Sequence, residues 1–507
     1  MKSGALWLGF AAMCLGMFMA VLDIQVVASS LTAIQAALHI PLSQLGWIQT
    51  AYLMAEVVAI PLTGILTRAF SLRFLFALAT FGFVVASVAC AASPSFEFLI
   101  AARVVQGFFG GMLIPSVFTA VFVLIPKQHQ VTATTMAGVA ALLAPTLGPL
   151  LGGWLTQTQS WHWIFLINIL PGLVVVWVVL AALKGEKTEI AALKRLDYPT
   201  LLLFALFLAG LQWLLSEGPR QHWQGGLVLS LAGLCAVACG WGIHRALSVA
   251  HPFVHLSRFR NRGFSLGCGL SFVLGMGLYG SVYLLAIFLG LVRGHTPLAI
   301  GMILVVSGAA QLVTAPVAAW AETRLDARLL TAFGFALFGL GLIANGFTTL
   351  NSDFDALFWP QVMRGLAVMF CLLPATRLAL DVWPQSQVAE ASGLFNLMRN
   401  LGGAIGIAAI DTILNERTPG HVASLVARLQ AGDPKAAAFS GLPTQLFHNR
   451  AMGPVDPITQ ALIEPMVRRA ALTQSCNEAW WVLGALFLLA LLLLPAMRRQ
   501  EAQPAER

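Results

Sequence analysis

The sequence predicts an all-α polytopic membrane protein with fourteen transmembrane helices, and two observations carry this prediction. Hydrophobic residues make up 58% of the 507 residues and charged residues only 10%, with a mean hydropathy of +0.83, whereas soluble domains carry about 25% charged residues. Apolar runs of about 20 residues, the length that a helix needs to cross a bilayer, follow one another along almost the whole chain. Transmembrane β-strands are about 10 residues long and alternate in polarity, so these continuous runs exclude a β-barrel.

The apolar runs mark the predicted spans in order. The first seven are Leu6–Ser29, Trp47–Leu66, Phe74–Ala92, Phe98–Leu124, Ala133–Leu155, Trp163–Leu183 and Pro199–Leu215. The second seven are Leu227–Ala246, Phe264–Val292, Leu298–Ala319, Leu329–Phe347, Leu357–Leu380, Ala389–Leu414 and Trp480–Met497. We do not expect the first run to be a signal peptide, because it is too long, follows only Lys2 as a basic residue, and contains Asp23.

Basic residues are distributed unevenly between the two sides of the predicted bundle. An even number of spans places both chain ends on one side. The basic residues of the loops on that side are Lys2, Arg68, Arg73, Lys127, Lys184, Lys187, Lys194, Arg195, Arg258, Arg260, Arg262, Arg324, Arg328, Arg498 and Arg499. The short loops of the other side hold only Arg220 and Arg293. Because basic loops stay in the cytoplasm, we expect a multi-pass inner-membrane protein with both termini cytoplasmic. The net charge of +8 follows from this bias and predicts contact with anionic membrane lipid, not with nucleic acid.

The sequence contains no pattern for a metal, a cofactor or a catalytic centre. Its seven cysteines are scattered and predict neither a disulfide framework nor a metal site. It has no Walker-type phosphate loop, no H-E-x-x-H and no G-x-S-x-G. We therefore expect no ATP hydrolysis and no enzymatic activity, and a membrane-embedded hydrolase is disfavoured.

One connection is far longer than the rest. Residues 415–479 separate the last two predicted spans, whereas helix–helix connections usually take about 2–8 residues. The segment contains amphipathic stretches that begin at His421 and Ile458, between Gly and Pro residues. We expect an external segment that serves as a mobile cover, a lid or a docking surface.

The fourth span contains a buried arginine and a glycine-rich surface. Arg103 lies within LIAARVVQGFFGGMLIPS, and Gln106 follows three residues later on the same helix face. A charge inside the membrane costs at least ~2.5 kcal/mol, so Arg103 needs a partner or a wet cavity. Gly107 begins a small-residue surface on which another helix can pack closely.

The fifth span contains APTLGPLLGGWL, in which prolines and glycines alternate. Pro145 and Pro149 each remove a backbone donor and predict a bend. Gly148, Gly152 and Gly153 allow a neighbouring helix to approach. On physical grounds alone this is a kinked packing helix.

Several of these stretches together resemble the major facilitator superfamily. Arg103 to Gly111 matches the fourth-helix motif l-x-x-x-R-x-x-q-G, and Ala144 to Gly153 matches the fifth-helix antiporter motif g-x-x-x-G-P-x-x-G-G, with Ala144 in place of its first glycine. The first span is similar to the L-D-x-x-I-V-N-V-A-L-P signature of the fourteen-helix drug:proton antiporters of the EmrB/QacA type, and Ala389 to Ala409 resembles their thirteenth helix.

The resemblance implies a fold and a division of the chain. The fold is the major facilitator fold, with two six-helix bundles and two linker helices. It places the first bundle at residues 1–183, the linker helices with cytoplasmic loops at 184–263, and the second bundle at 264–507, including the external segment 415–479. In a bacterium with two membranes it also implies a periplasmic adaptor (a membrane fusion protein) and an outer-membrane channel as partners.

The loop after the second span departs from the family pattern G-x-L-x-D-R-x-G-R-R. In GILTRAFSLR, Gly64 and Arg73 fit the pattern. Arg68 stands where the pattern has Asp, and Ser71 where it has Gly. This exchange puts the family's carboxylate latch at this loop in question.

Two carboxylates lie well inside the first half of the chain, and proton coupling needs such groups. Asp23 and Glu56 would be costly if ionised and facing lipid. Burial disfavours the charged form of a carboxyl group while a nearby arginine favours it, so such a site can bind and release protons. Asp23 lies at a depth similar to that of Arg103, and we expect the two to pair, for coupling or as a purely structural ion pair. Whether Glu56 faces the cavity stays open.

Further polar residues in the spans are candidates for the substrate path. Gln25, Gln106, Asn396 and Arg399 are predicted to line the substrate cavity or to gate it. Arg364 and Asp411 are weaker candidates in the second half of the chain.

Taken together, these features predict proton-coupled export of lipophilic or cationic toxic compounds by alternating access, with small molecules, protons and membrane lipid as partners. An exporter of a specific metabolite, lipid or siderophore is the nearest alternative. A membrane sensor or scaffold that binds a ligand without moving it is the alternative from another class.

Overall fold

The computed structural model describes residues 3–39, 44, 46–184, 188, 197–249, 254–444 and 457–496. These residues are overwhelmingly helical and contain no strand. Thirteen of their helices are long and apolar enough to cross a membrane, and a helix bent by 45° brings the number to fourteen. The prediction of an all-α polytopic protein with fourteen spans is therefore confirmed. Lys2, Lys187, Lys194, Arg195, Met497, Arg498 and Arg499 lie outside the described residues.

The helices before residue 184 form the first bundle. They are α1 (Ser3–Leu38), α2 (Trp47–Phe70), α3 (Leu72–Ala91), α4 (Phe96–Leu124), the bent α5 (Gln130–Thr158), α6 (Trp163–Leu166) and α7 (Ile169–Ala182). The two linker helices are α9 (Tyr198–Glu217) and α10 (Gly226–Ser248).

The helices after residue 260 form the second bundle. They are α11 (Arg262–Ile287), α12 (Pro297–Glu322), α13 (Ala327–Asn345), α14 (Phe354–Leu380), α15 (Gln385–Gln430), the short α16 (Pro434–Phe439) and α17 (Pro457–Ala490). Single turns of 3-10 or π-helix lie at Lys127–His129, Pro219–Gln221, Leu256–Arg260, Phe288–Val292 and Leu491–Ala496.

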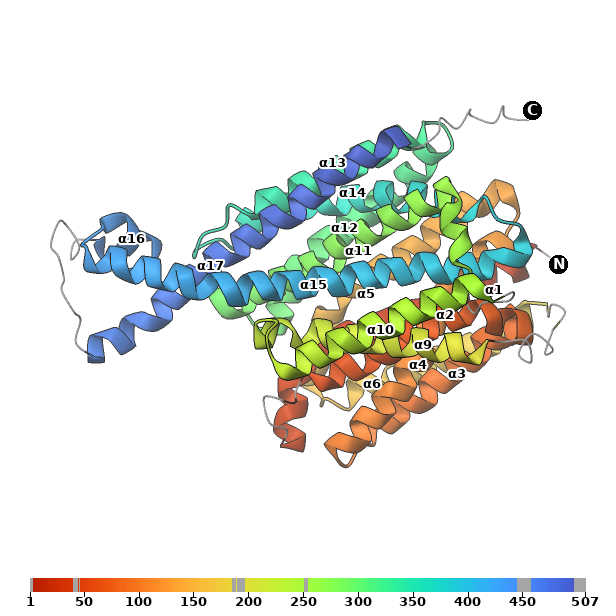
Figure 1. Cartoon of the computed structure of the whole chain (residues 1–507), viewed down its shortest axis with the longest axis horizontal. Helices are drawn as coiled ribbons and strands as arrows, with labels where there is room; N and C mark the ends of the chain where they lie inside the picture. The colour runs from red at the N-terminus through yellow and green to blue at the C-terminus, as the bar shows by residue number, and fades with distance from the viewer. Residues whose placement is uncertain are drawn as a thin grey trace.

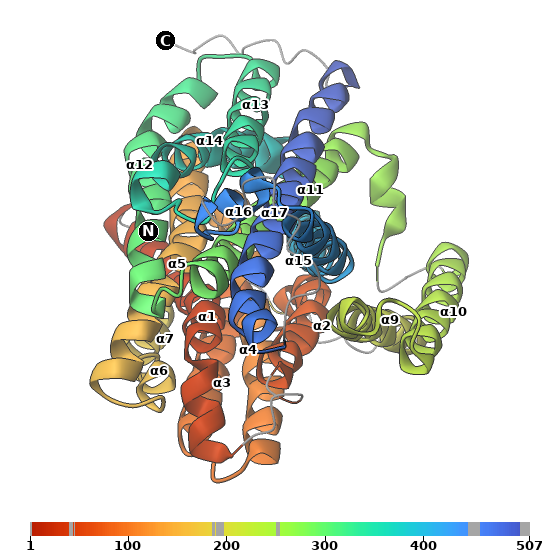
Figure 2. The same cartoon turned by 90° about the vertical axis from the view of Figure 1, so that its left-hand side faces the viewer.

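The long helices lie side by side along the longest axis of the molecule (Figure 1). The first and the last described residues lie at one end, which we call the terminal end, and α15, α16 and α17 project from the opposite end, which we call the extension end (Figure 1). Figure 2 shows the two bundles one above the other, with α9 and α10 at the edge of the molecule beyond α2. The bundles contact each other where α2 and α4 pack against α15, and where α5 packs against α12.

Polar residues at the helix starts explain why the apolar runs begin where they do. Ser95 accepts a hydrogen bond from the backbone N–H of Phe98 at 3.3 Å and so caps α4. Asp326 caps α13 in the same way. Thr296 caps α12, and Pro297 occupies the first helical position, where its missing N–H costs nothing. These caps satisfy backbone donors that would otherwise end unpaired near the membrane surface.

The segment at residues 415–479 is more regular than the sequence predicted. Its described residues are mostly helical: α15 continues past Leu414 to Gln430, and α17 begins at Pro457, well before the predicted span. The two amphipathic stretches noted in the sequence are these helix ends, and they pack through a small apolar cluster that includes Leu425, Leu429 and Val467. The predicted boundaries were too short because an apolar run marks membrane depth, whereas a helix continues wherever an amphipathic face finds a partner.

Candidate functional site

Asp23 of α1 and Arg103 of α4 form a fully buried ion pair. A guanidinium nitrogen of Arg103 lies 2.5 Å from Asp23 Oδ2, and both side chains have zero exposed area. Gln106 and Asn168 donate to the other carboxylate oxygen, Oδ1, at 3.0 and 2.9 Å. The pairing expected from the sequence is present, and the carboxylate charge is balanced by one cation and two amides.

The rest of this network ties the first bundle together. Ser87 of α3 accepts hydrogen bonds from Gln106 and Asn168. Arg103 also donates to Gln106 Oε1 at 2.7 Å and to the backbone carbonyl of Ile48 at 3.1 Å. It lies over the ring of Tyr52, 4.3 Å from the centroid. Side chains or backbone of α1, α2, α3, α4 and the start of α7 thus meet in one closed network.

A cavity of about 220 Å³ lies between the two bundles and does not include Asp23, Arg103 or Gln106 in its lining. Its walls come from α1, α2 and α4 on one side, α11 and α15 on the other, and α9 at the edge. The wall residues divide evenly between apolar or glycine residues and polar residues. The polar ones are Gln25, Gln49, Thr50, Glu56, Gln212, Ser216, Arg220, Tyr279, Tyr283, Asn400 and Asp411.

Glu56 faces this cavity, which answers the question that the sequence left open. It is 2% exposed, and Asn400 of α15 donates to its Oε1 at 3.4 Å across the bundle interface. Among the described residues it forms no ion pair, in contrast to Asp23. Glu56 is therefore a buried carboxyl group that lines the cavity and contacts an amide of the other bundle.

Asp411 is a second acid of the cavity, nearer the extension end. Tyr283 of α11 donates its hydroxyl to Asp411 Oδ1 at 2.6 Å. The sequence marked Asp411 as a weak candidate because it lies near the end of an apolar run. In the structure Asp411 lines the cavity and stands within α15, not at its end, because the helix continues to Gln430.

Of the four predicted cavity or gating residues, only Gln25 lines the cavity. Gln106 belongs to the Asp23 network. Asn396 and Arg399 pair with each other at 2.6 Å, buried on the face of α15 that packs on α4. Arg399 lies 5.2 Å from the centroid of the Phe118 ring.

The motif glycines lie at close contacts between helices. A Cβ at Gly107 would stand 2.2 Å from the carbonyl oxygen of Tyr52, so α4 packs directly on α2. A Cβ at Gly148 would stand 2.2 Å from Cβ of Gln25, on α1, and one at Gly153 would meet the backbone of Leu298, on α12, at 2.9 Å. Gly152 accepts a hydrogen bond from Ser30 through its carbonyl at 3.4 Å, and Pro149 lies in the same helix, which is bent by 45°.

At the terminal end, Glu390 of α15 joins three basic side chains. Arg68 of α2 binds its Oε1, Arg258 lies 2.5 Å from Oε2, and His255 lies 3.2 Å from Oε2. A Cβ at Gly64 would stand 2.8 Å from the Cα of Glu390, so the motif glycine permits this contact. Burial and the nearby Arg68 lower the pKa of Arg258 to about 10.

Arg68 therefore has an ionic partner although it replaces the aspartate of the family pattern. Here the cation is on α2 and the carboxylate is on α15, whereas the family pattern has the carboxylate on the loop after the second helix. An ion pair still connects the two bundles. Arg73 does not join this cluster; it donates to the backbone carbonyl of Leu180.

Several residues of these sites escaped the sequence reasoning, among them Asn400 beside Glu56 and Tyr283 beside Asp411. Ser87 and Asn168 complete the Asp23 network, and Glu390 completes the terminal-end cluster. Asn168 left a signal, a single amide within the apolar run WHWIFLINILPG. Glu390 left none, because it lies at the start of a predicted span, where a charge is ordinary.

Comparisons with known proteins agree with this arrangement. Residues 13–407 match the Major Facilitator Superfamily. The chain is 37% identical to the colistin resistance protein EmrB of Acinetobacter baumannii, over 97% of this chain and 96% of that one. It is 30% identical to the multidrug export protein EmrB of Escherichia coli, over 95% and 93% of the two chains, and 30% identical to the fatty acid resistance protein FarB of Neisseria gonorrhoeae, over 83% of each.

A solved structure confirms the fold. The proton:xylose symporter XylE superposes with a TM-score of 0.61 over 97% of this chain and 96% of that chain, at 13% sequence identity. Two bundles around a central cavity, the buried Arg103 and the glycine-lined α5 all agree with the expected family. The chain is a multi-pass membrane transporter that belongs to the major facilitator superfamily, among proteins of the EmrB type.

Proposed function

We propose that this protein exports lipophilic or cationic toxic compounds across the inner membrane in exchange for protons, by alternating access. The observation that carries this proposal is the cavity between the bundles, with aliphatic, aromatic and amide walls and the buried acid Glu56. The apolar half of the cavity wall suits the body of a lipophilic compound, and its amides and acids suit a polar or cationic group. The names of the relatives, which cite multidrug export, colistin resistance and fatty acid resistance, support the same substrate class.

Glu56 is the group for which proton and substrate compete. Its ionised carboxylate forms no direct ion pair among the described residues, and a buried charge without a direct counterion is costly at this depth. A proton or a cationic group of the substrate offsets that cost, and the two exclude each other. Because Asn400 of α15 contacts Glu56 of α2, the charge of this one group acts on the contact between the two bundles.

Asp23 and Arg103 serve coupling from outside the cavity. Their network joins the helices of the first bundle, so a change in the charge of Asp23 alters how that bundle moves as a unit. Arg103 touches Tyr52 and the Ile48 carbonyl on α2, the helix that carries Glu56. This contact connects the two acids through one rigid helix.

The extension formed by α15, α16 and α17 is the docking surface for a periplasmic adaptor, which passes the compound to an outer-membrane channel. Both termini then lie in the cytoplasm, at the end where the basic loops gather. The extension projects from the opposite end as ordered helices, which supports a contact surface rather than a mobile cover (Figure 1).

Vesicles reconstituted with the purified protein test this function. With ethidium as substrate and an imposed pH gradient, we expect ethidium movement coupled to proton movement in the opposite direction. Glu56→Gln should abolish the proton-driven movement. Glu97→Gln, at an exposed acid at the start of α4, should leave it unchanged. Ethidium binding without proton-coupled movement in the unaltered protein would favour a sensor or scaffold instead.

A further inference from the structure

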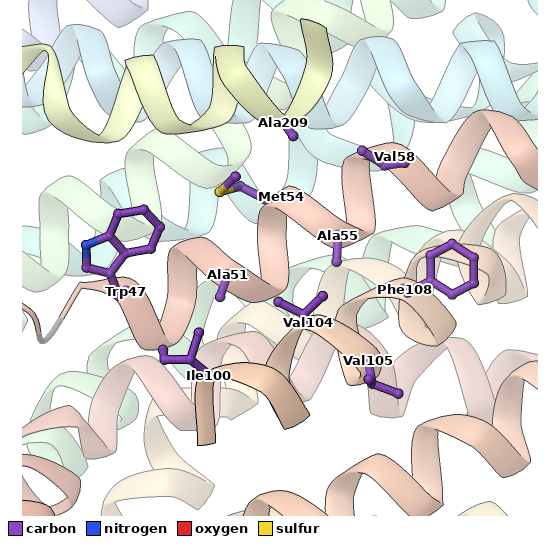
Figure 3. A pocket seen from close by; sticks show the side chains of 10 residues that line it. All are labelled: Trp47, Ala51, Met54, Ala55, Val58, Ile100, Val104, Val105, Phe108 and Ala209. Atoms are coloured by element: carbon purple, nitrogen blue, oxygen red, sulfur yellow. The ribbon is translucent and has the colours of Figure 1, made fainter. Parts of the chain in front are cut away.

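A second pocket, of about 530 Å³, lies on the outer face of the first bundle. All ten residues that line it are apolar (Figure 3). They come from α2, α4 and α9, three helices long and apolar enough to span the membrane. In Figure 3, Met54 lies on the side of α2 nearer to Ala209 of α9, and Val104 of α4 lies on the other side of α2. The pocket therefore opens toward the hydrocarbon of the bilayer.

Only the thickness of one helix separates this pocket from the central cavity. On α2, Trp47, Ala51, Met54 and Val58 line the outer pocket, at the i, i+4, i+7 and i+11 spacing of one helix face. Leu53, Glu56 and Val57 of the same helix line the central cavity.

Helix α9 belongs to both sites as well. Ala209 lines the outer pocket, whereas Gln212 and Ser216, one and two turns further along, line the central cavity. We call the line of contact between α2 and α9 the seam. One hydrogen bond and one aromatic contact connect the two helices there. Thr50 and Ser216 share a hydrogen bond at 3.1 Å, and the rings of Trp47 and Trp213 meet edge to face at 5.2 Å.

The linker helices are the least enclosed part of the membrane-spanning region. Only 22% of the apolar window of α9 is buried, against 56% for α2 and 78% for α4. Figure 2 shows α9 and α10 standing at the edge of the molecule. Helix α9 is therefore the less enclosed of the two helices at this contact, although its Leu208 packs into the main apolar core.

We propose that the outer pocket is an entry site for the alkyl or aryl body of lipophilic compounds dissolved in the membrane, and that the seam between α2 and α9 is the gate into the central cavity. The inference rests on the proposed export function. A compound held against Met54 and Val104 passes between α2 and α9 and meets Gln49, Gln212 and Glu56, where its polar end finds partners. The outer pocket thus admits compounds that dissolve in the membrane, and the central cavity then selects among them by charge.

A disulfide across the seam tests the gate. Thr50→Cys and Ser216→Cys, in a protein whose seven native cysteines are replaced, place two thiols where the two hydroxyls lie 3.1 Å apart. We expect oxidation to reduce export of the membrane-soluble dye Hoechst 33342 at least tenfold, and a reducing agent to restore it. The two single-cysteine proteins, given the same oxidant, are the controls. Unchanged export by the crosslinked protein would overturn the gate.

Photolabelling tests the entry site without any transport. A dodecanoic acid that carries a diazirine on its alkyl chain should label the segments of α2 and α4 around Met54 and Val104. Val104→Trp should reduce that labelling at least fivefold by filling the pocket, whereas Val85→Trp on α3, at a similarly exposed valine outside the pocket, should not. Membrane levels of the two variants serve as the check on folding.

The two experiments separate failure of this inference from failure of the proposed function. If the unaltered protein does not export the dye, the proposed function fails, while specific labelling by the fatty acid still supports the entry site. If a diazirine-bearing phosphatidylcholine labels the pocket and excess dodecanoic acid does not compete, the pocket holds a structural lipid and the entry site is wrong.

Discussion

Arg68 of α2 and Glu390 of α15 form an ion pair across the two bundles, 322 residues apart in the chain. The family pattern has an aspartate at the position of Arg68. In this protein the first bundle therefore supplies the positive charge of the pair, and Glu390 of the second bundle supplies the negative charge. Arg258 and His255 bind the same carboxylate, which makes Glu390 the shared anion of the terminal end. In the proposed alternating-access cycle, this cluster separates when that end opens.

Exchanging the charges of the pair tests its role. Arg68→Glu faces Glu390 with a like charge, and we expect at least a tenfold loss of export at equal membrane level. Adding Glu390→Arg should restore part of the export, but not all, because the new arginine lies beside Arg258. Arg324→Glu, at an exposed arginine in another loop of the terminal end, is the control and should have little effect. Equal export by all variants would show that the pair does not contribute.

Variants of Asp23 and Arg103 test whether their ion pair serves proton coupling or only stability. Asp23→Asn leaves the charge of Arg103 buried without its counterion, which destabilises proteins by about 3–5 kcal/mol. We expect proton-driven export to be lost and the unfolding temperature to fall. Asp23→Asn combined with Arg103→Gln removes both charges and should recover the unfolding temperature but not the export. Recovered export in the double variant would mean that the ion pair is purely structural.

Helix α5 requires glycine where it crosses α1. A Cβ at Gly148 would lie 2.2 Å from the Cβ of Gln25, far inside van der Waals contact. Gly148→Leu should therefore abolish export. Gly269→Leu is a matched control in α11, because a Cβ there meets no atom within 4 Å, and export should continue. The comparison is made at equal membrane level.

The Arg293–Asp353 contact at the extension end predicts a pH dependence. The hydrogen bond from Arg293 lowers the pKa of Asp353 to about 2, with further lowering from His295 and the Phe354 N–H. The unfolded value is about 3.9, so the charged form stabilises the fold above about pH 4, and this contribution is lost as the pH falls toward 2. Asp353 is partly exposed, so Asp353→Asn should lower the unfolding temperature by only about 1 °C at pH 7. The difference between the two proteins should vanish near pH 2. A difference that persists at pH 2 would contradict this origin.

Thiol labelling tests which side of the membrane the extension occupies. Ser424 of α15 is exposed, and in a cysteine-free background Ser424→Cys should react with a membrane-impermeant reagent added to intact cells from outside. Ser440→Cys is a matched control in the extension; Ser440 is 1% exposed, so its reaction should be at least tenfold slower. Ser248→Cys, at the end of α10, should react only after the membrane is opened. Reaction of Ser424→Cys only in opened cells would reverse the proposed orientation.

The sequence by itself determined the features that depend on local composition. Apolar runs determined the number and order of the spans, because transfer of a helix into the bilayer depends on the sum of its own side chains. Because a buried charge is costly in the membrane, Arg103 needed a partner. Asp23 was the predicted partner because it lies at a similar depth. The motif glycines in the fourth and fifth helices determined where close packing is possible.

Tertiary structure decided everything that depends on which faces of the helices meet. Glu56 faces the cavity and contacts Asn400, 344 residues away in the chain. This contact exists because α2 packs against α15 with the face that carries Glu56 turned toward it. The partner of Arg68 and the closure of the Asp23 network by Ser87 and Asn168 depend in the same way on neighbours distant in the chain. A hydrophobic pattern determines membrane depth, but within a bilayer lipid and protein are both apolar, so small residues and polar contacts between helices decide the rotation.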